Sequence, residues 1–201
     1  MRLGRLGWAV LALAPTPALA HSPIPGLKGF YTGMLHPFST PAQALLVIAL
    51  GLLIGWFEAR RARWTLAAFF IAMLGGGLMG GGPRPLDALL FAGAFAACAL
   101  AALTPGRLFP LVLAITAISG WVIGIVSVPD PGPDRARIIT LSGAFVGANL
   151  GLLYLWGTSQ FIRERYPQVW IGIAFRIAAA WIGALALIML ALRVVTDGKM
   201  P

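Results

Sequence analysis

The sequence predicts an all-α, polytopic transmembrane helical bundle with about six spans after a cleavable signal peptide. The chain is 59% hydrophobic and only 10% charged, and its mean hydropathy is +0.88. Six apolar runs, each near the length of a membrane span, cover most of it. A bilayer core needs roughly 20 apolar residues per helix, so runs of this kind predict spans rather than the core of a soluble domain.

The first 20 residues have the pattern of a secretory signal peptide. Arg2 and Arg5 form a basic start, a short apolar stretch follows, and Ala18 and Ala20 fit a small-x-small cleavage site. An uncleaved first helix is the alternative, but prolines interrupt the apolar stretch. We expect cleavage after residue 20, so that the mature chain begins at His21.

Residues 21–40 are rich in proline and glycine and too polar to cross a bilayer. We expect them to form a periplasmic segment that leads along the membrane to the first span. The transmembrane domain then covers residues 41–193, and a short periplasmic tail follows at 194–201. The six spans are predicted at 41–57, 65–81, 88–104, 108–128, 138–157 and 169–192.

An exported N-terminus orients the chain in the inner membrane of a bacterium. The densest basic cluster, Arg60, Arg61 and Arg63, then lies in the cytoplasm, in weak agreement with the positive-inside rule. The outer segments hold as many basic residues, so the signal peptide carries the orientation. The formal charge of +9 is scattered through short loops. This scatter favours the lipid bilayer, and not nucleic acid, as the partner of the basic residues.

Glycines recur at a spacing of four residues in several predicted spans. They are Gly51 with Gly55, Gly76 with Gly80, Gly120 with Gly124, and the series Gly143, Gly147 and Gly151. This spacing places small residues along one helix face, where two backbones can approach closely. We expect a compact bundle without a large pore.

Enzyme chemistry is not expected. The sequence has no P-loop, no nucleophile with its base and no paired carboxylates within a span, and little chain lies outside the spans. Cys98 is the single cysteine, which excludes an intramolecular disulfide, and we interpret it as a small buried hydrophobic residue.

Two histidines are candidate metal ligands. Cleavage would leave the α-amine of His21 beside its own imidazole, and together these groups can chelate a transition metal, since imidazole suits nickel, copper and zinc. The alternative is that His21 only satisfies the signal peptidase. His36 precedes the first span and could join His21 at an outer site, or it could act as an interfacial or capping residue.

Four polar residues within the predicted spans are candidates for a transport path: Gln43, Ser119, Asn149 and Arg176. Hydrogen bonding between helices is the alternative for Ser119 and Asn149. Arg176 either extends to the cytoplasmic interface or faces a wet cavity.

The signal peptide, the histidine at 21 and the run GFYTGMLHPF at 29–38 together resemble the HupE/UreJ family of small membrane proteins. The resemblance implies a signal with about six spans and a nickel or cobalt permease linked to hydrogenase and urease maturation. The family's first motif continues to a Gly-x-Asp-His pair, where this chain has Pro41, Ala42 and Gln43.

The family's second motif, His-Gly-x-x-His-Gly-x-Glu, is similar to residues 119–126. This chain keeps both glycines there and has Ser119, Ile123 and Val126 in place of the metal-binding side chains. A histidine that the resemblance implies in the fifth span is also absent.

Three hypotheses follow. The first is a divergent permease for a transition metal, with His21 and His36 capturing the ion and Gln43, Ser119 and Asn149 lining its path. The second is a non-transporting accessory protein that binds a membrane partner, such as a metalloenzyme or an electron-transfer complex, or a second copy of itself. The third is transport of a small neutral or organic solute through the same bundle.

Overall fold

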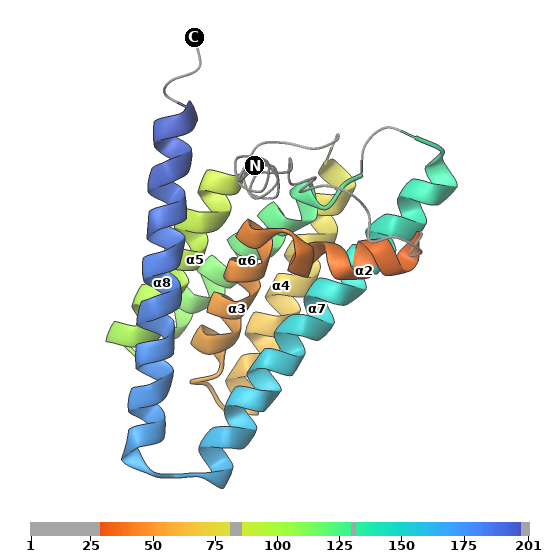
Figure 1. Cartoon of the computed structure of the whole chain (residues 1–201). Helices are drawn as coiled ribbons and strands as arrows, with labels where there is room; N and C mark the ends of the chain where they lie inside the picture. The colour runs from red at the N-terminus through yellow and green to blue at the C-terminus, as the bar shows by residue number, and fades with distance from the viewer. Residues whose placement is uncertain (1–28, 81–85, 130–131, 198–201) are drawn as a thin grey trace, which may run out of the picture.

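The computed structural model describes residues 29–80, 86–129 and 132–197, and every regular element among them is an α-helix (Figure 1). The helices are α2 (Phe30–Ser39), α3 (Pro41–Ile54), α4 (Ala59–Met79), α5 (Asp87–Leu103), α6 (Phe109–Val126), α7 (Asp134–Arg165) and α8 (Val169–Asp197). The predicted all-α fold is confirmed. The predicted signal peptide and His21 lie outside the described residues.

Each of the six predicted spans coincides with one helix, from α3 to α8. Four of them, α4, α6, α7 and α8, are long and apolar enough to cross a membrane. α5 has 17 residues, and α3 has 14, or about 21 Å of helix, which is short for a hydrocarbon core of about 30 Å. The number of crossings therefore remains a prediction.

α2 is a helix that the sequence did not predict. Together α2 and α3 have the length and composition of a fifth span, but their axes are bent by 76°. Figure 1 shows α2 lying across the bundle, at a steep angle to α8. The first apolar segment of the described chain is therefore a broken one, and its break lies among the predicted site residues.

From α3 to α8, successive helices run in alternating directions along the bundle (Figure 1). The contacts between helices agree with this order. Gly51 and Gly55 of α3 face Leu155 and Ser159 of α7, so these two helices run parallel. The start of α3 and the end of α8 consequently lie toward the same end of the bundle.

The predicted glycine faces hold helices together. A Cβ at Gly76 would overlap the backbone of Trp121, and a Cβ at Gly124 would overlap that of Met73, so α4 and α6 approach within backbone contact. Within a membrane, such approach replaces the hydrophobic driving force with close packing. The predicted role of these glycines in bundle packing is confirmed.

α7 uses its glycine series to hold α2. A Cβ at Gly143 would overlap the carbonyl of Phe30, and one at Gly147 would overlap that of Met34. On α2, a Cβ at Gly33 would overlap the carbonyl of Thr140. The two helices run in the same direction along this contact, and α7 thereby fixes the position of α2.

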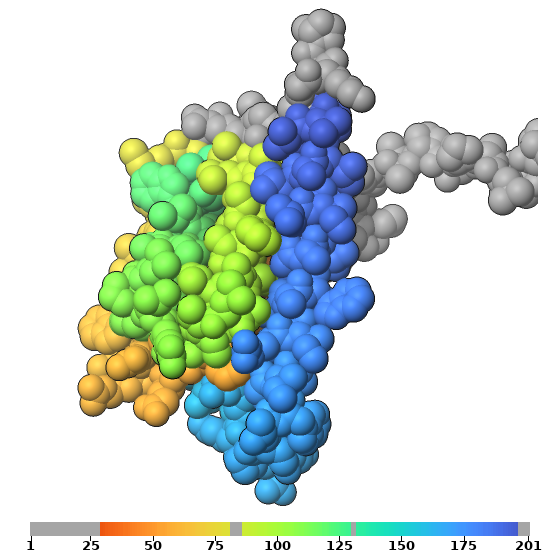
Figure 2. Space-filling model, turned by 90° about the vertical axis from the view of Figure 1, so that its left-hand side faces the viewer, coloured from red at the N-terminus to blue at the C-terminus, as the bar shows by residue number. Residues whose placement is uncertain are grey.

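The outer surface of the bundle is apolar. Figure 2 shows α8 running beside α5, with α6 on the far side of α5. Large side chains of α8 are left exposed, among them Ile177 at 52%, Trp181 at 71% and Leu185 at 52%. Water would penalise such a surface and lipid would not. The chain is an integral membrane protein.

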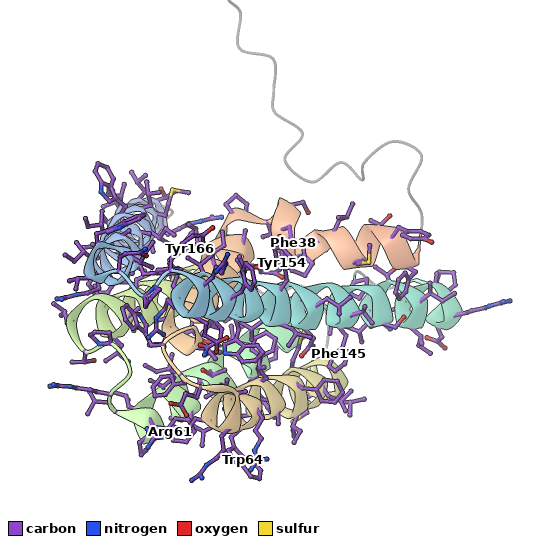
Figure 3. The ribbon with its side chains drawn as sticks, turned by 90° about the horizontal axis from the view of Figure 1, so that it is seen from below. Phe38, Arg61, Trp64, Phe145, Tyr154 and Tyr166 are labelled. Atoms are coloured by element: carbon purple, nitrogen blue, oxygen red, sulfur yellow. The ribbon has the colours of Figure 1, made fainter. Side chains whose placement is uncertain are left out.

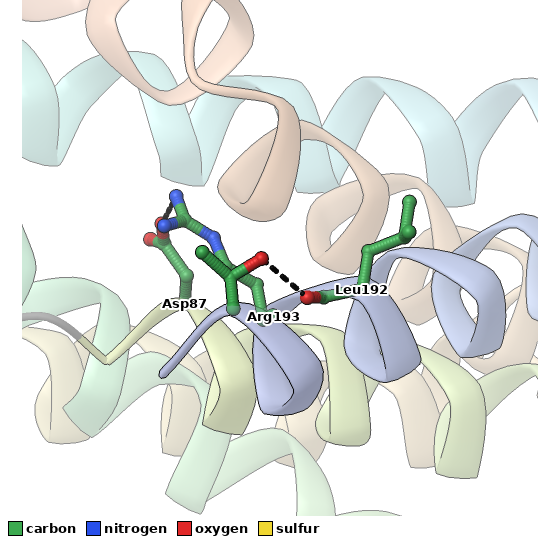
Figure 4. Close-up of polar contacts among 4 residues, drawn as sticks. Asp87, Leu192 and Arg193 are labelled. Atoms are coloured by element: carbon green, nitrogen blue, oxygen red, sulfur yellow. Dashed lines mark hydrogen bonds and ion pairs between the residues drawn. The ribbon is translucent and has the colours of Figure 1, made fainter. Parts of the chain in front are cut away.

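α5 and α8 are joined closely at mid-length and by charge at one end. A Cβ at Gly183 of α8 would lie 3.0 Å from the Cβ of Cys98, which is buried as expected. At the end of α8, Arg193 forms an ion pair with Asp87, the first residue of α5 (Figure 4). Because both groups are partly exposed, we assign the pair a modest contribution to stability.

Candidate functional site

The bend between α2 and α3 follows from its prolines. Pro41 begins α3, and the residue before a proline is kept out of the helical region. Thr40 accordingly has φ −98° and ψ 111°, an extended conformation. The carbonyl of His36 accepts hydrogen bonds from the Thr40 N–H at 3.2 Å and from the Ser39 hydroxyl at 3.1 Å. We call residues 36–43 the elbow.

His36 and Gln43 contact each other across the elbow. The Nε2 atoms of the two side chains lie 3.3 Å apart. The Gln43 amide can donate to the lone pair of a neutral imidazole, or, if the amide is turned, its oxygen can accept a hydrogen bond from the ring. Gln43 is only 2% exposed, and its Oε1 atom has no hydrogen-bond partner in the described part of the chain.

Ser119 lines a small pocket between α3, α5 and α6. The pocket has a volume of about 90 Å³, and its walls are otherwise apolar. Leu46, about one turn after Gln43 on α3, forms part of the wall. The pocket therefore adjoins the helix that carries Gln43.

Asn149 makes the interhelical contact that the sequence left open as an alternative. Its amide nitrogen donates to the carbonyl of Phe145 at 2.8 Å and lies 3.6 Å from the sulfur of Met73 on α4. Asn149 therefore joins α7 to α4.

Arg176 binds the end of a neighbouring helix. Its Nε atom donates to the carbonyl of Ala102 at 2.7 Å, near the C-terminal end of α5. A cation at this position interacts favourably with the negative end of the helix dipole. Arg176 lies toward the end of the bundle opposite to the start of α3.

The candidate residues thus form one contacting pair and three separate positions. His36 and Gln43 meet at the elbow, whereas Ser119, Asn149 and Arg176 contact different helices. Within residues 29–80, 86–129 and 132–197, no group of three His, Cys, Asp or Glu side chains could hold a metal ion. Any metal bound at the elbow would need water, backbone or amide oxygens, or His21, to complete its ligands.

The comparisons with known proteins bear on the elbow. Residues 9–88 match the family model described as HupE / UreJ protein. The match confirms the HupE/UreJ resemblance predicted from the sequence, and it covers less than half of the chain. It includes α2, α3 and α4, and so the whole elbow.

The stretch 119–126, which the sequence suggested as the second HupE/UreJ motif, lies beyond the matched segment. No curated protein and no solved structure gave a significant match to the chain.

Sequence reasoning did not anticipate α2 or the contact between His36 and Gln43. One signal for α2 was present, since Gly29 and Gly33 have the same spacing of four as the other packing glycines, and Gly33 lies against α7. The contact itself required the bend, because residues seven apart on a continuous helix are separated by about two turns, or roughly 10 Å.

Proposed function

We propose that this protein is a HupE/UreJ-like permease for a divalent transition metal ion, nickel or cobalt in the first instance, and that His36 receives the ion at the elbow. The observation that carries the proposal is the contact between His36 and Gln43 within the segment that matches the family model. Copper is a further candidate substrate because it also binds imidazole well.

The elbow provides one strong and one weak ligand for a metal ion. Imidazole nitrogen suits nickel, cobalt and copper, whereas an amide oxygen binds them less well. The Oε1 atom of Gln43 is nevertheless buried and has no hydrogen-bond partner among the described residues, so a cation beside it would satisfy an atom that the protein leaves unpaired. We propose that His21 and water supply the remaining ligands.

We propose further that the ion moves from the elbow past Ser119 and Asn149 toward the end of the bundle that carries Arg176. A weak set of donors favours release over tight retention, as a transport path requires. The pocket beside Ser119, at about 90 Å³, holds only a few water molecules, so passage requires the helices to separate.

The proposal assigns the protein to the inner membrane of a bacterium. Residues 1–20 are removed as a signal peptide, and the start of α3 faces the periplasm. The ion then enters from the periplasmic side and leaves near the arginines at the start of α4.

The test compares metal accumulation by cells with metal binding by the purified full chain. His36→Ala and His36→Gln should lower both for nickel or cobalt, and adding His21→Ala should lower them further. Tyr31→Phe is the matched control, since Tyr31 is 58% exposed on the same helix. If the double histidine variant accumulates and binds metal as the wild type does, the permease proposal is wrong.

A second function is favoured by the contacts around residues 119–126. Gly120 and Gly124 pack against α4, whereas Ser119, Ile123 and Val126 offer no strong metal ligand. A scaffold that keeps its packing without ligands suits an accessory protein for a metalloenzyme or an electron-transfer complex. Such a protein should co-purify with a defined enzyme subunit, and elution of the chain alone from mild detergent would count against this role.

A further inference from the structure

Exposed basic side chains cluster where α4 begins. Arg60, Arg61 and Arg63 lie in the first turn and a half of α4, and Arg107 lies in the connection between α5 and α6. The guanidinium carbon of Arg61 is 5.8 Å from the ring centroid of Phe109, which places this connection beside the start of α4. We call Arg60, Arg61, Arg63 and Arg107, with Trp64, the α4 basic patch.

Within the part of the chain that the structure describes, no ion pair neutralises the α4 basic patch. The first turn of α4 contains no acidic residue, and the side chain of its N-cap residue, Glu58, makes no capping hydrogen bond. Three cations also lie at the positive end of the α4 dipole, where cations are destabilising. The opposite end of the bundle differs, because there Arg193 is paired with Asp87.

Trp64 places the α4 basic patch at the depth of lipid head groups. Its side chain is 57% exposed, and the guanidinium carbon of Arg63 lies 5.2 Å from its ring centroid. The apolar part of α4 begins directly after it, and tryptophan is enriched where hydrocarbon meets head groups. In Figure 3, Arg61 and Trp64 both project outward from the bundle.

From this geometry we infer that the α4 basic patch binds the head group of an anionic phospholipid. A phosphodiester oxygen accepts paired hydrogen bonds from a guanidinium group, and the exposed indole packs on the adjoining glycerol and acyl chain. The negative charge offsets both the mutual repulsion of the arginines and their unfavourable position on the helix dipole. This site is separate from the elbow and does not depend on metal transport.

The test is lipid binding by the purified full chain in detergent, followed by native mass spectrometry. The wild type is titrated with phosphatidylglycerol, with phosphatidylcholine and with inorganic phosphate. We expect clear preference for phosphatidylglycerol, weakened by high salt. Arg61→Gln with Arg63→Gln should weaken its binding about 25-fold, because each arginine contributes about fivefold.

The matched control is Arg135→Gln with Arg165→Gln, which removes the same charge from two exposed positions outside the patch and should leave binding unchanged. Arg61→Lys with Arg63→Lys should recover part of the binding. Arg107→Gln, which changes no helical residue, should also weaken the binding of phosphatidylglycerol. Equal binding of the two lipids, equal losses in both double glutamine variants, or equally strong binding of inorganic phosphate would each overturn the inference.

Discussion

Gln43 is a buried side chain that is only half satisfied. Its Nε2 atom contacts His36, but its Oε1 atom has no hydrogen-bond partner among the described residues. A hydrogen bond between side chains in a membrane protein contributes about 0.6 kcal/mol, whereas an unpaired buried acceptor costs about 1–3 kcal/mol. We therefore expect Gln43→Leu to stabilise the empty protein by about 1 kcal/mol, measured as thermal unfolding in detergent.

The comparison for this prediction is Gln43→Ala, which also removes the amide but leaves a cavity and should lower stability. A buried oxygen without a hydrogen-bond partner lowers the stability of the empty protein, which is consistent with a ligand-binding role for Gln43. Gln43→Leu should therefore also bind added nickel less well. A clear loss of stability in Gln43→Leu would show that the amide is fully paired.

Arg163 of α7 contacts the C-terminal end of α3. It donates to the carbonyl of Gly55 at 2.7 Å, and its guanidinium carbon lies 4.4 Å from the ring centroid of Trp56. A hydrogen bond from a charged donor and a cation–π contact are both lost in Arg163→Gln, so we expect unfolding to become easier by about 1–3 kcal/mol. Thermal unfolding in detergent measures this loss of stability.

Arg165 provides the matched control, because it is exposed and two residues away on the same helix. Arg165→Gln should change stability by no more than about 0.5 kcal/mol. If both variants unfold alike, the contacts of Arg163 with Gly55 and Trp56 contribute nothing to the folded state.

At the scale of elements, the glycine face of α7 decides where α2 lies. In Gly147→Leu the new side chain would occupy the space of the Met34 backbone, so α2 must leave α7 or shift along it. Because overpacking a close contact costs about 1–3 kcal/mol or more, we expect a clear loss of thermal stability together with a loss of metal binding at the displaced elbow.

Gly157→Leu makes the same substitution in the same helix at a position with open space around the added Cβ. It should unfold as the wild type does. Equal behaviour of the two variants would mean that the contact between α2 and α7 does not hold α2 in place.

The contrast between α2 and the other helices shows what a sequence can predict. α3 to α8 are long apolar runs. The apolar pattern of each run predicts a helix without knowledge of what that helix packs against. α2 has ten residues with Pro37 inside it, and an isolated helix of this length is marginal in water. It depends on contact with Gly143 and Gly147 of α7, more than 100 residues away, so its own residues do not by themselves determine where it lies.

For the candidate site, too, the sequence predicted the residues but not their contacts. His36 and Gln43 could be singled out by residue type, but the sequence placed one at an outer capture site and the other on a path through the bundle. Their contact depends on the bend at Thr40. Asn149 and Arg176 were equally visible as polar residues in apolar runs, and only the folded chain shows that each contacts a neighbouring helix.

At the scale of the whole molecule, the alternating directions of α3 to α8 make the orientation testable at any connection. The basic start of α4 and the connection at Arg107 lie at one end, and Gly80 and Val128 lie at the other. With an exported N-terminus, a reporter active only in the periplasm should work when fused after Gly80 or Val128. It should be silent after Arg63 or Arg107.

These four fusions also test the number of crossings that precede them. If α2 and α3 enter and leave on the same side as a re-entrant pair, every later connection changes sides, and the fusions after Arg63 and Arg107 become active instead. That pattern would place the α4 basic patch in the periplasm and Arg193 with Asp87 in the cytoplasm. Because the start of α3 lies toward the same end of the bundle as the end of α8, the elbow would then lie toward the cytoplasmic end, and His36 would not receive an ion directly from the periplasm.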